Sequence, residues 1–137
     1  MPEISSPELI MLYHLGQEDP DGIKVQSVLR SMEISFREIH LEDLGQSVGT
    51  LAGLSNPAAA EPVLQEPLGA AMLFVGFSKD RLQEVLARLR DTQAGLTSLK
   101  AMLTQHNQAW RFFDLLIELK KERDTIAQMG RAHSPTR

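Results

Sequence analysis

The stretch Ala70-Ala71-Met72-Leu73-Phe74-Val75-Gly76-Phe77 is the strongest strand signal in the 137-residue chain. Its apolar residues follow one another without alternating with polar ones, which is typical of a strand buried on both faces. A second run of this kind, Leu9-Ile10-Met11-Leu12-Tyr13, lies near the start of the sequence. The two runs therefore predict two central strands of one sheet.

A helix signal follows each of these runs. After the first run along the chain, Asp19 or Asp21 can cap a helix, and Pro20 suits its first turn. After the second, Ser78 is the expected N-cap. We therefore expect one helix directly after each central strand.

Weaker, partly alternating strands follow the two helices, at residues 34–39 and at residues 99–103. The order strand, helix, strand thus occurs twice, over residues 9–42 and residues 72–105. Since the second strand of each unit is less apolar than the first, we expect it at an edge of the sheet.

Two α/β architectures with a four-stranded sheet and a C-terminal helix fit this order. If residues 41–69 cross over as a helix, all four strands are parallel, in three layers with strand order 2-1-3-4, and we favour this alternative. If that connection returns directly, the fold is a ferredoxin-like sandwich with an added helix. In both, residues 1–128 form one domain with a Pro-rich connection at 55–69, and residues 129–137 form a flexible tail.

Composition and charge exclude several classes of protein. The chain has no cysteine, which excludes a disulfide scaffold, thiol chemistry and thiolate metal sites. Residues 1–70 carry 11 acidic and 3 basic residues, and residues 71–137 carry 7 acidic and 11 basic ones. No apolar run approaches the roughly 20 residues of a membrane span, and the sequence starts without a signal-peptide pattern. We expect a cytoplasmic protein with no membrane partner.

The basic residues of the second half do not predict nucleic-acid binding. Lys79, Arg81, Arg88 and Arg90 border both sides of the leucine seam on the helix after Ser78. Long basic side chains in such positions lie along the edge of a core contact and reach water. No nucleic-acid partner is expected.

Polar side chains stand at the carboxyl ends of the expected strands. In a fully parallel sheet these ends form one rim, where ligands bind in open α/β folds. The ligand-binding candidates at this rim are His14, Ser78, Thr104, His106 and Asn107. In the ferredoxin-like alternative the set splits, with His14 and His40 on one rim and Ser78, His106 and Asn107 on the other. Helix capping by Ser78 and Thr104 is the competing structural interpretation.

No nucleophile, metalloprotease or P-loop motif accompanies these candidates. We therefore expect no catalytic residue, no metal site and no cofactor. The series Gly45, Gly49 and Gly53 lacks the lysine and hydroxyl residue of a P-loop. We expect these glycines to allow close packing.

The last helix, expected from an N-cap at Thr104 to about Ala127, has an unusually broad apolar arc. At about 100° per residue its apolar side chains cover roughly 220°. The helix is therefore either wedged between the sheet and another element, or part of its arc is a dimer contact. Trp110, Phe113 and Ile117 are the interface candidates, because aromatic side chains are enriched at interfaces.

Three parts of the second half form a recognisable pattern. They are Met72-Leu73-Phe74-Val75-Gly76-Phe77-Ser78, Leu99-Lys100-Ala101-Met102-Leu103-Thr104, and Asn107 with Trp110 ahead of residues 115–119. This pattern resembles the DUF3783 family over about residues 71–125. The resemblance implies a bacterial origin but no activity. It directs attention to Lys100, either a solvated lysine at a strand edge or a further ligand-binding candidate, and to Asn107 and Trp110.

The leading hypothesis is a small, non-catalytic interaction or regulatory module that self-associates as a homo-oligomer. It rests on the broad apolar arc of the last helix and on the lack of a catalytic motif. The alternative is a small-molecule or phosphometabolite binder, or an enzyme, that uses the strand-end rim around His14, Ser78, His106 and Asn107.

Overall fold

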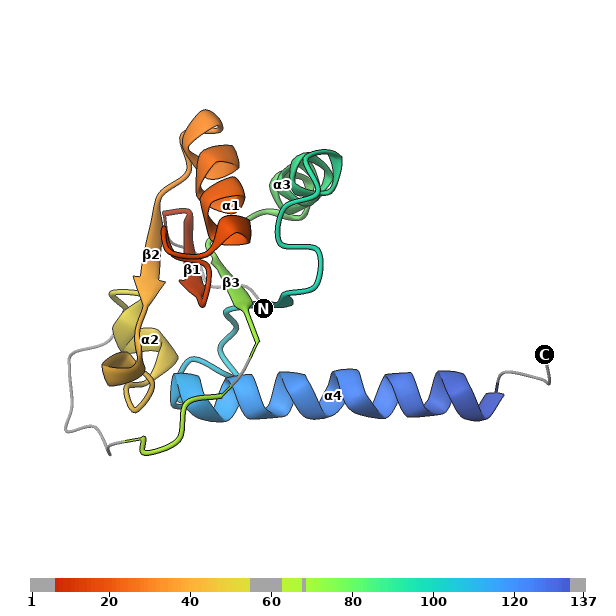
Figure 1. The fold of residues 1–137 in the computed structure, drawn as a ribbon. Helices are drawn as coiled ribbons and strands as arrows, with labels where there is room; N and C mark the ends of the chain where they lie inside the picture. The colour runs from red at the N-terminus through yellow and green to blue at the C-terminus, as the bar shows by residue number, and fades with distance from the viewer. Residues whose placement is uncertain (1–6, 55–62, 68, 134–137) are drawn as a thin grey trace.

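The computed structural model describes residues 7–54, 63–67 and 69–133. Most of the Pro-rich connection and the end of the tail lie outside this part of the chain. The described elements form a four-stranded sheet with helices on both of its faces (Figure 1). In chain order they are β1 (Leu9–Tyr13), α1 (Pro20–Ser31), β2 (Phe36–Ile39), a 3₁₀ turn (Leu41–Asp43), α2 (Val48–Leu51), β3 (Ala71–Val75), α3 (Lys79–Asp91), β4 (Leu99–Met102) and α4 (Phe112–His133).

The strand order β2-β1-β3-β4 is the predicted one, but the sheet is mixed. β1 is parallel to β2 and β3 is parallel to β4, whereas β1 and β3 are antiparallel, with Leu9 opposite Val75 and Tyr13 opposite Ala71. The favoured expectation of a fully parallel sheet is therefore wrong.

The reason for the reversed direction is the shortness of the helix between β2 and β3. A crossover between parallel strands usually needs a dozen or more residues, most often as a helix that runs back along the sheet. In the described part of this connection α2 has only four residues, and it lies beside the end of β2 (Figure 1). The chain consequently enters β3 at the same end of the sheet at which β2 finishes, so β3 runs in the opposite direction.

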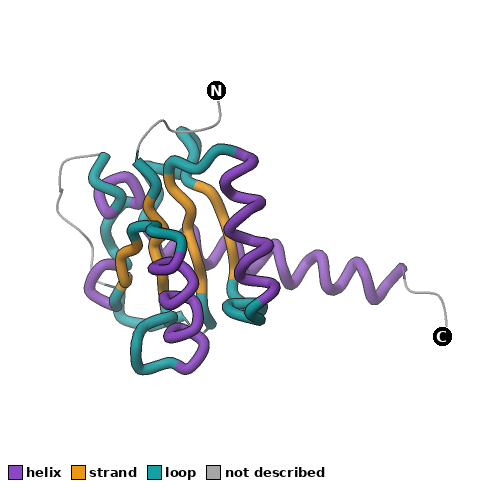
Figure 2. The backbone as a smooth tube through the Cα atoms, turned by 90° about the horizontal axis from the view of Figure 1, so that it is seen from above, coloured by secondary structure: helices purple, strands orange, loops and turns teal. Residues whose placement is uncertain are grey.

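Helices lie on both faces of the sheet (Figure 2), and each face supports a separate core. Side chains alternate between the faces along a strand, so a continuous apolar run contributes to both cores. The core under α1 and α3 includes Ile10, Leu12, Met72, Phe74, Val25, Leu29, Val85 and Leu89. The core under α2 and α4 includes Met11, Tyr13, Leu73, Val75, Leu44, Val48, Phe112 and Leu115. The prediction that β1 and β3 are buried on both faces is confirmed.

The predicted caps of the first two long helices are confirmed. Asp19 Oδ1 accepts hydrogen bonds from the backbone N–H groups of Asp21, at 2.8 Å, and Gly22, at 3.4 Å. Ser78 Oγ accepts from the N–H of Arg81 at 3.1 Å. Each cap satisfies a donor at a helix start that has no intrahelical partner.

The start of α4 differs from the prediction. Thr104 does not cap this helix, which begins eight residues later at Phe112 and continues to His133. Residues 105–109 form turns. After them, the N–H groups of Phe112 and Phe113 donate to the carbonyls of Gln46 and Leu44, at 2.9 and 3.0 Å. These long-range bonds satisfy the first donors of α4 in place of a side-chain cap.

Candidate functional site

The mixed sheet separates the polar residues that a parallel sheet would have gathered. His14 and His40 follow β1 and β2 at one end of the strands. Ser78, Thr104, His106 and Asn107 follow β3 and β4 at the opposite end, and these two ends are the edges compared below. The single rim expected for the parallel sheet is therefore not formed. The arrangement is the split that the second architecture predicted.

At the β3–β4 edge, Thr104 and Asn107 bind each other and the backbone. Asn107 Oδ1 accepts from the N–H of Thr104 at 2.9 Å, and Thr104 Oγ1 accepts from the N–H of Asn107 at 3.2 Å. The Asn107 amide also donates to the carbonyl of Met102 at 3.0 Å, and the residue is only 8% exposed. These contacts give Asn107 a structural role in the turn after β4. His106 is exposed, and its ring lies edge-on to Trp110 at 5.2 Å.

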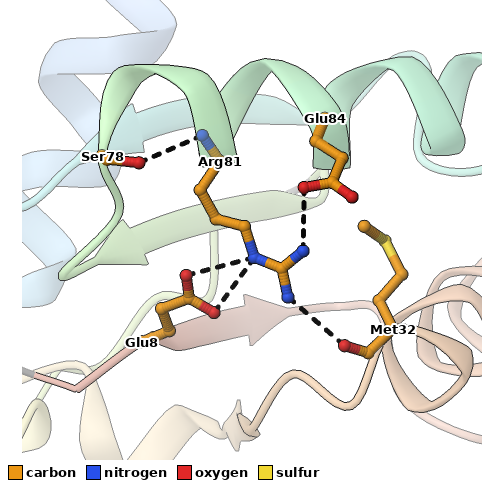
Figure 3. A network of polar contacts seen from close by, with 5 residues as sticks. All are labelled: Glu8, Met32, Ser78, Arg81 and Glu84. Atoms are coloured by element: carbon orange, nitrogen blue, oxygen red, sulfur yellow. Dashed lines mark hydrogen bonds and ion pairs between the residues drawn. The ribbon is translucent and has the colours of Figure 1, made fainter.

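Ser78, at the same edge, caps the helix that carries the polar network of Figure 3. The Arg81 guanidinium donates to Glu8 at 3.1 Å, to Glu84 at 3.0 Å and to the carbonyl of Met32 at 3.3 Å. The hydrogen bonds to Glu84 and Glu8 raise the pKa of Arg81 above its ordinary value. Arg81 therefore ties α3 to β1 and to the end of α1 and is engaged within the fold.

Lys100 is exposed on the edge strand β4, in keeping with the interpretation of a solvated lysine, and its ammonium also binds the loop before that strand. Its ammonium donates to the carbonyl of Gly95 at 2.8 Å and to that of Ser98 at 3.2 Å. Burial of the ammonium, reinforced by the Arg123 charge, lowers the pKa of Lys100, and Asp21 partly opposes this effect. The hydrogen bonds indicate that Lys100 supports the loop between α3 and β4.

A cavity of about 200 Å³ opens at the other edge, beyond the carboxyl ends of β1 and β2. Its polar lining comes from His14, Glu18, Glu38, His40 and Glu66, and a shallower hollow of about 350 Å³ adjoins it along Gly16, Glu18 and Asp19. The two histidines are among the residues that the sequence places at strand ends, whereas none of these glutamates is predicted to lie here. Glu66 is 52 positions from His14, and only the fold brings the two together.

His14 and Tyr13 hold the chain segment that precedes β3. His14 Nδ1 lies 2.8 Å from the carbonyl oxygen of Gly69, and His14 Nε2 lies 2.9 Å from Glu66 Oε2. The Tyr13 hydroxyl donates to the carbonyl of Pro67 at 2.8 Å. Burial, and after it the charge of Glu66, raises the pKa of Tyr13 to about 12. The end of β1 thus anchors Glu66, Pro67 and Gly69 through side chains.

The interface candidates lie near this segment but differ in exposure. Trp110 and Phe113 are half-buried, and Ile117 is 38% exposed. A groove of about 280 Å³ runs between α4 and residues 65–67, lined by Gln65, Glu66, Pro67, Phe113, Ile117 and Lys120. Trp110 precedes α4, so its predicted place in the helical arc is wrong.

Two further properties concern the described residues as a whole. Within residues 7–54, 63–67 and 69–133, no group of three or more histidine, aspartate and glutamate side chains is placed to hold a metal ion. In the same part of the chain, no helix has both the length and the apolar character that crossing a bilayer requires.

The four-stranded mixed sheet and its helices make this a small α/β protein. Residues 70–126 match the family model DUF3783, a domain of unknown function, so the predicted resemblance is confirmed over this segment. The match spans β3, α3, β4 and most of α4, whereas the cavity beside His14 lies before it. Comparisons with curated proteins and with solved structures gave no match.

Proposed function

We propose that the chain is a non-catalytic interaction module that associates with a second copy of itself through α4. The observation that carries this proposal is the length of α4 relative to the body of the domain. The helix has 22 residues, which corresponds to about 33 Å, and it extends well past the sheet and the other helices (Figure 1).

The supported and the projecting parts of α4 share one apolar face. Leu115 is buried against the sheet, and Leu119, one turn later, is half-buried. Ile126 lies within about 20° of the same face at 3.6 residues per turn, but it is 68% exposed. Between them, Arg123 donates to the carbonyl of Thr97 at 2.8 Å, a contact with the loop before β4.

An exposed helical end of this kind gains stability from a partner. Isolated helices of fewer than about 12–15 residues are marginal in water, and most helical stability in proteins comes from packing of an apolar face. Lys120 to Asp124 carry both signs of charge, so a second copy of this segment meets complementary charges. The charges of −8 on residues 1–70 and +4 on residues 71–137, from the counts given above, also attract one another between copies.

Sedimentation velocity across a range of protein concentrations tests this proposal. The wild type is expected to form dimers, and Ile126→Glu is expected to weaken them at least about tenfold, or about 1.4 kcal/mol. Thr125→Glu is the matched control, because it adds the same charge at an exposed position about 100° away. A wild type that stays monomeric at high concentration contradicts the proposal, as does equal weakening by both variants.

A second candidate function is small-molecule binding in the cavity beside His14. The observation in its favour is the position of that cavity at the carboxyl ends of two parallel strands, beside the start of α1. Because Glu18, Glu38 and Glu66 line it, this candidate suits a cationic or uncharged ligand better than a phosphometabolite. Shifts of the Gly16 and His40 amide resonances on addition of a simple diamine, compared with inorganic phosphate, test it.

A further inference from the structure

The contacts between the end of β1 and the described residues before β3 include a histidine with two hydrogen-bond partners. His14 bridges two groups of that segment, the Gly69 carbonyl at 2.8 Å and the Glu66 carboxylate at 2.9 Å. We call these three residues the histidine clasp. The His14 ring is held in place by stacking on the Tyr13 ring, with 3.9 Å between the two ring centroids. The backbone of His14 has a φ of +58°.

The chemistry of the two acceptors determines the form of the ring. A backbone carbonyl accepts hydrogen bonds and cannot donate one, and the same holds for an ionised carboxylate. Both ring nitrogens must therefore donate, and only the imidazolium form carries a hydrogen on each of them. A neutral ring can donate to Gly69 or to Glu66, but it leaves the other contact as two facing acceptors.

The titratable groups around His14 come from several elements. Tyr13 precedes it on β1, and Glu66 faces it from the segment before β3. The adjoining cavities add Glu18 and Asp19 from the loop before α1, Glu38 from β2 and His40 from the end of β2. Apart from His40, the charged groups that share these cavities with His14 are acidic, so the imidazolium is the local positive charge opposite Glu66.

The clasped segment is also one wall of the groove on α4. Gln65, Glu66 and Pro67 face Phe113 and Ile117 across a volume of about 280 Å³. Glu66 lines both this groove and the cavity beside His14. A change at His14 is therefore transmitted to the groove through a single residue.

We propose that the histidine clasp is a proton-operated latch, which fixes Glu66 and Gly69 to the end of β1 while His14 is an imidazolium and loses one of these two contacts when the ring loses its proton. The latch is closed where His14 is protonated and Glu66 is ionised. It opens when the ring loses its proton, because one ring nitrogen then becomes an acceptor that faces another acceptor.

NMR of the full chain tests the latch directly. Ring-nitrogen resonances of His14 are expected to show a hydrogen on both nitrogens at about pH 6. The ¹H–¹⁵N heteronuclear NOE of Gln65, Glu66 and Gly69 is expected to fall between about pH 6 and about pH 8.5. An unprotonated ring nitrogen at about pH 6, or an NOE that is equal at both pH values, overturns the proposal.

Two variants separate the latch from other titrations. In Glu66→Gln a neutral ring donates to Gly69 through Nδ1 and accepts from the glutamine amide through Nε2, so the segment is expected to stay ordered at both pH values. His14→Phe retains the stacking on Tyr13 but neither hydrogen bond, and the NOE is expected to be low at both. A fall with pH that persists unchanged in His14→Phe assigns it to another group and overturns the proposal.

The consequence for the Phe113 side of α4 rests on the proposed self-association, and the experiments keep the two apart. The NMR measurements report on the latch in a dilute monomer, whereas sedimentation reports on association. If the chain does not associate but the NOE falls with pH as described, the latch stands and the interaction proposal fails.

Discussion

Ionisation of Tyr13 offers a sensitive test of how Pro67 is attached to the sheet. Tyr13 is the one tyrosine in the chain, is 1% exposed, and donates a hydrogen bond to the carbonyl of Pro67 at 2.8 Å. Burial, and to a smaller extent Glu66, raises its pKa from 10.0 to about 12. The folded state thus favours the protonated phenol.

The pH range follows from the direction of this shift. Because the pKa is raised on folding, the stabilisation is complete below about pH 10 and is lost as the pH rises toward 12. Two pH units correspond to about 2.7 kcal/mol in total, of which about 1.4 kcal/mol is lost by about pH 11. At neutral pH, Tyr13→Phe removes the hydrogen bond to Pro67 and is expected to cost about 0.5–1.5 kcal/mol.

The measurement is urea unfolding of the wild type and of Tyr13→Phe at about pH 8 and about pH 11. At about pH 8 the wild type is expected to be more stable than Tyr13→Phe. At about pH 11 this difference in the free energy of unfolding is expected to vanish or reverse. Subtracting the free energies of unfolding of the two proteins removes the contribution of the lysines and arginines that titrate in the same pH range. A phenolate absorbance that titrates near pH 10 in the folded protein refutes the reasoning, as does a stability difference that is the same at both pH values.

Two further substitutions test the contacts that position the loops. Gly22→Ala is expected to destabilise the protein by about 1–3 kcal/mol in urea unfolding, although alanine favours helices, because its Cβ would overlap the Gly16 carbonyl oxygen. Ile23→Ala, at a 47% exposed position, is the control and should cost less. Asn107→Asp is expected to cost about 1–3 kcal/mol, since the carboxylate cannot donate to the Met102 carbonyl as the amide does. Unchanged unfolding midpoints in both would contradict the roles given to these residues.

Much of the local structure could be predicted because its causes are local. The continuous apolar runs at β1 and β3 require burial on both faces, whatever the rest of the chain does. The starts of α1 and α3 are marked by Asp19 and Ser78, whose side chains bind backbone N–H groups two or three residues later. Pro20 suits the first turn of α1. The edge strands β2 and β4 could also be recognised from their own residues, because apolar and polar side chains partly alternate along them.

The start of α4 was not predictable from such local signals. Thr104 and Asn107 have the spacing of a helix cap, and their side chains do bind each other's backbone N–H groups. The helix nevertheless begins at Phe112, because the carbonyls of Gln46 and Leu44 accept from its first N–H groups. Nothing near residue 104 in the sequence signals those partners, because they lie in a distant part of the chain, around α2.

The candidate site was only half predictable. A histidine after a buried strand is visible in the sequence, so His14 could be selected before its surroundings were known. Glu66 lies in a Pro-rich stretch without periodicity, and its place opposite His14 depends on the path of the chain from β2 to β3. The same path separates Ser78 from His14, because it makes β3 antiparallel to β1.

By itself, the sequence determined the α/β class, the two central strands, the caps of α1 and α3, and the likeness of the second half to DUF3783. These follow from burial patterns and hydrogen bonds within a few residues of one another. The tertiary structure alone decided the direction of β3, the first turn of α4 and the histidine clasp. Each of these depends on groups far apart in the chain, and only the packing of both faces of the sheet brings such groups within hydrogen-bonding distance.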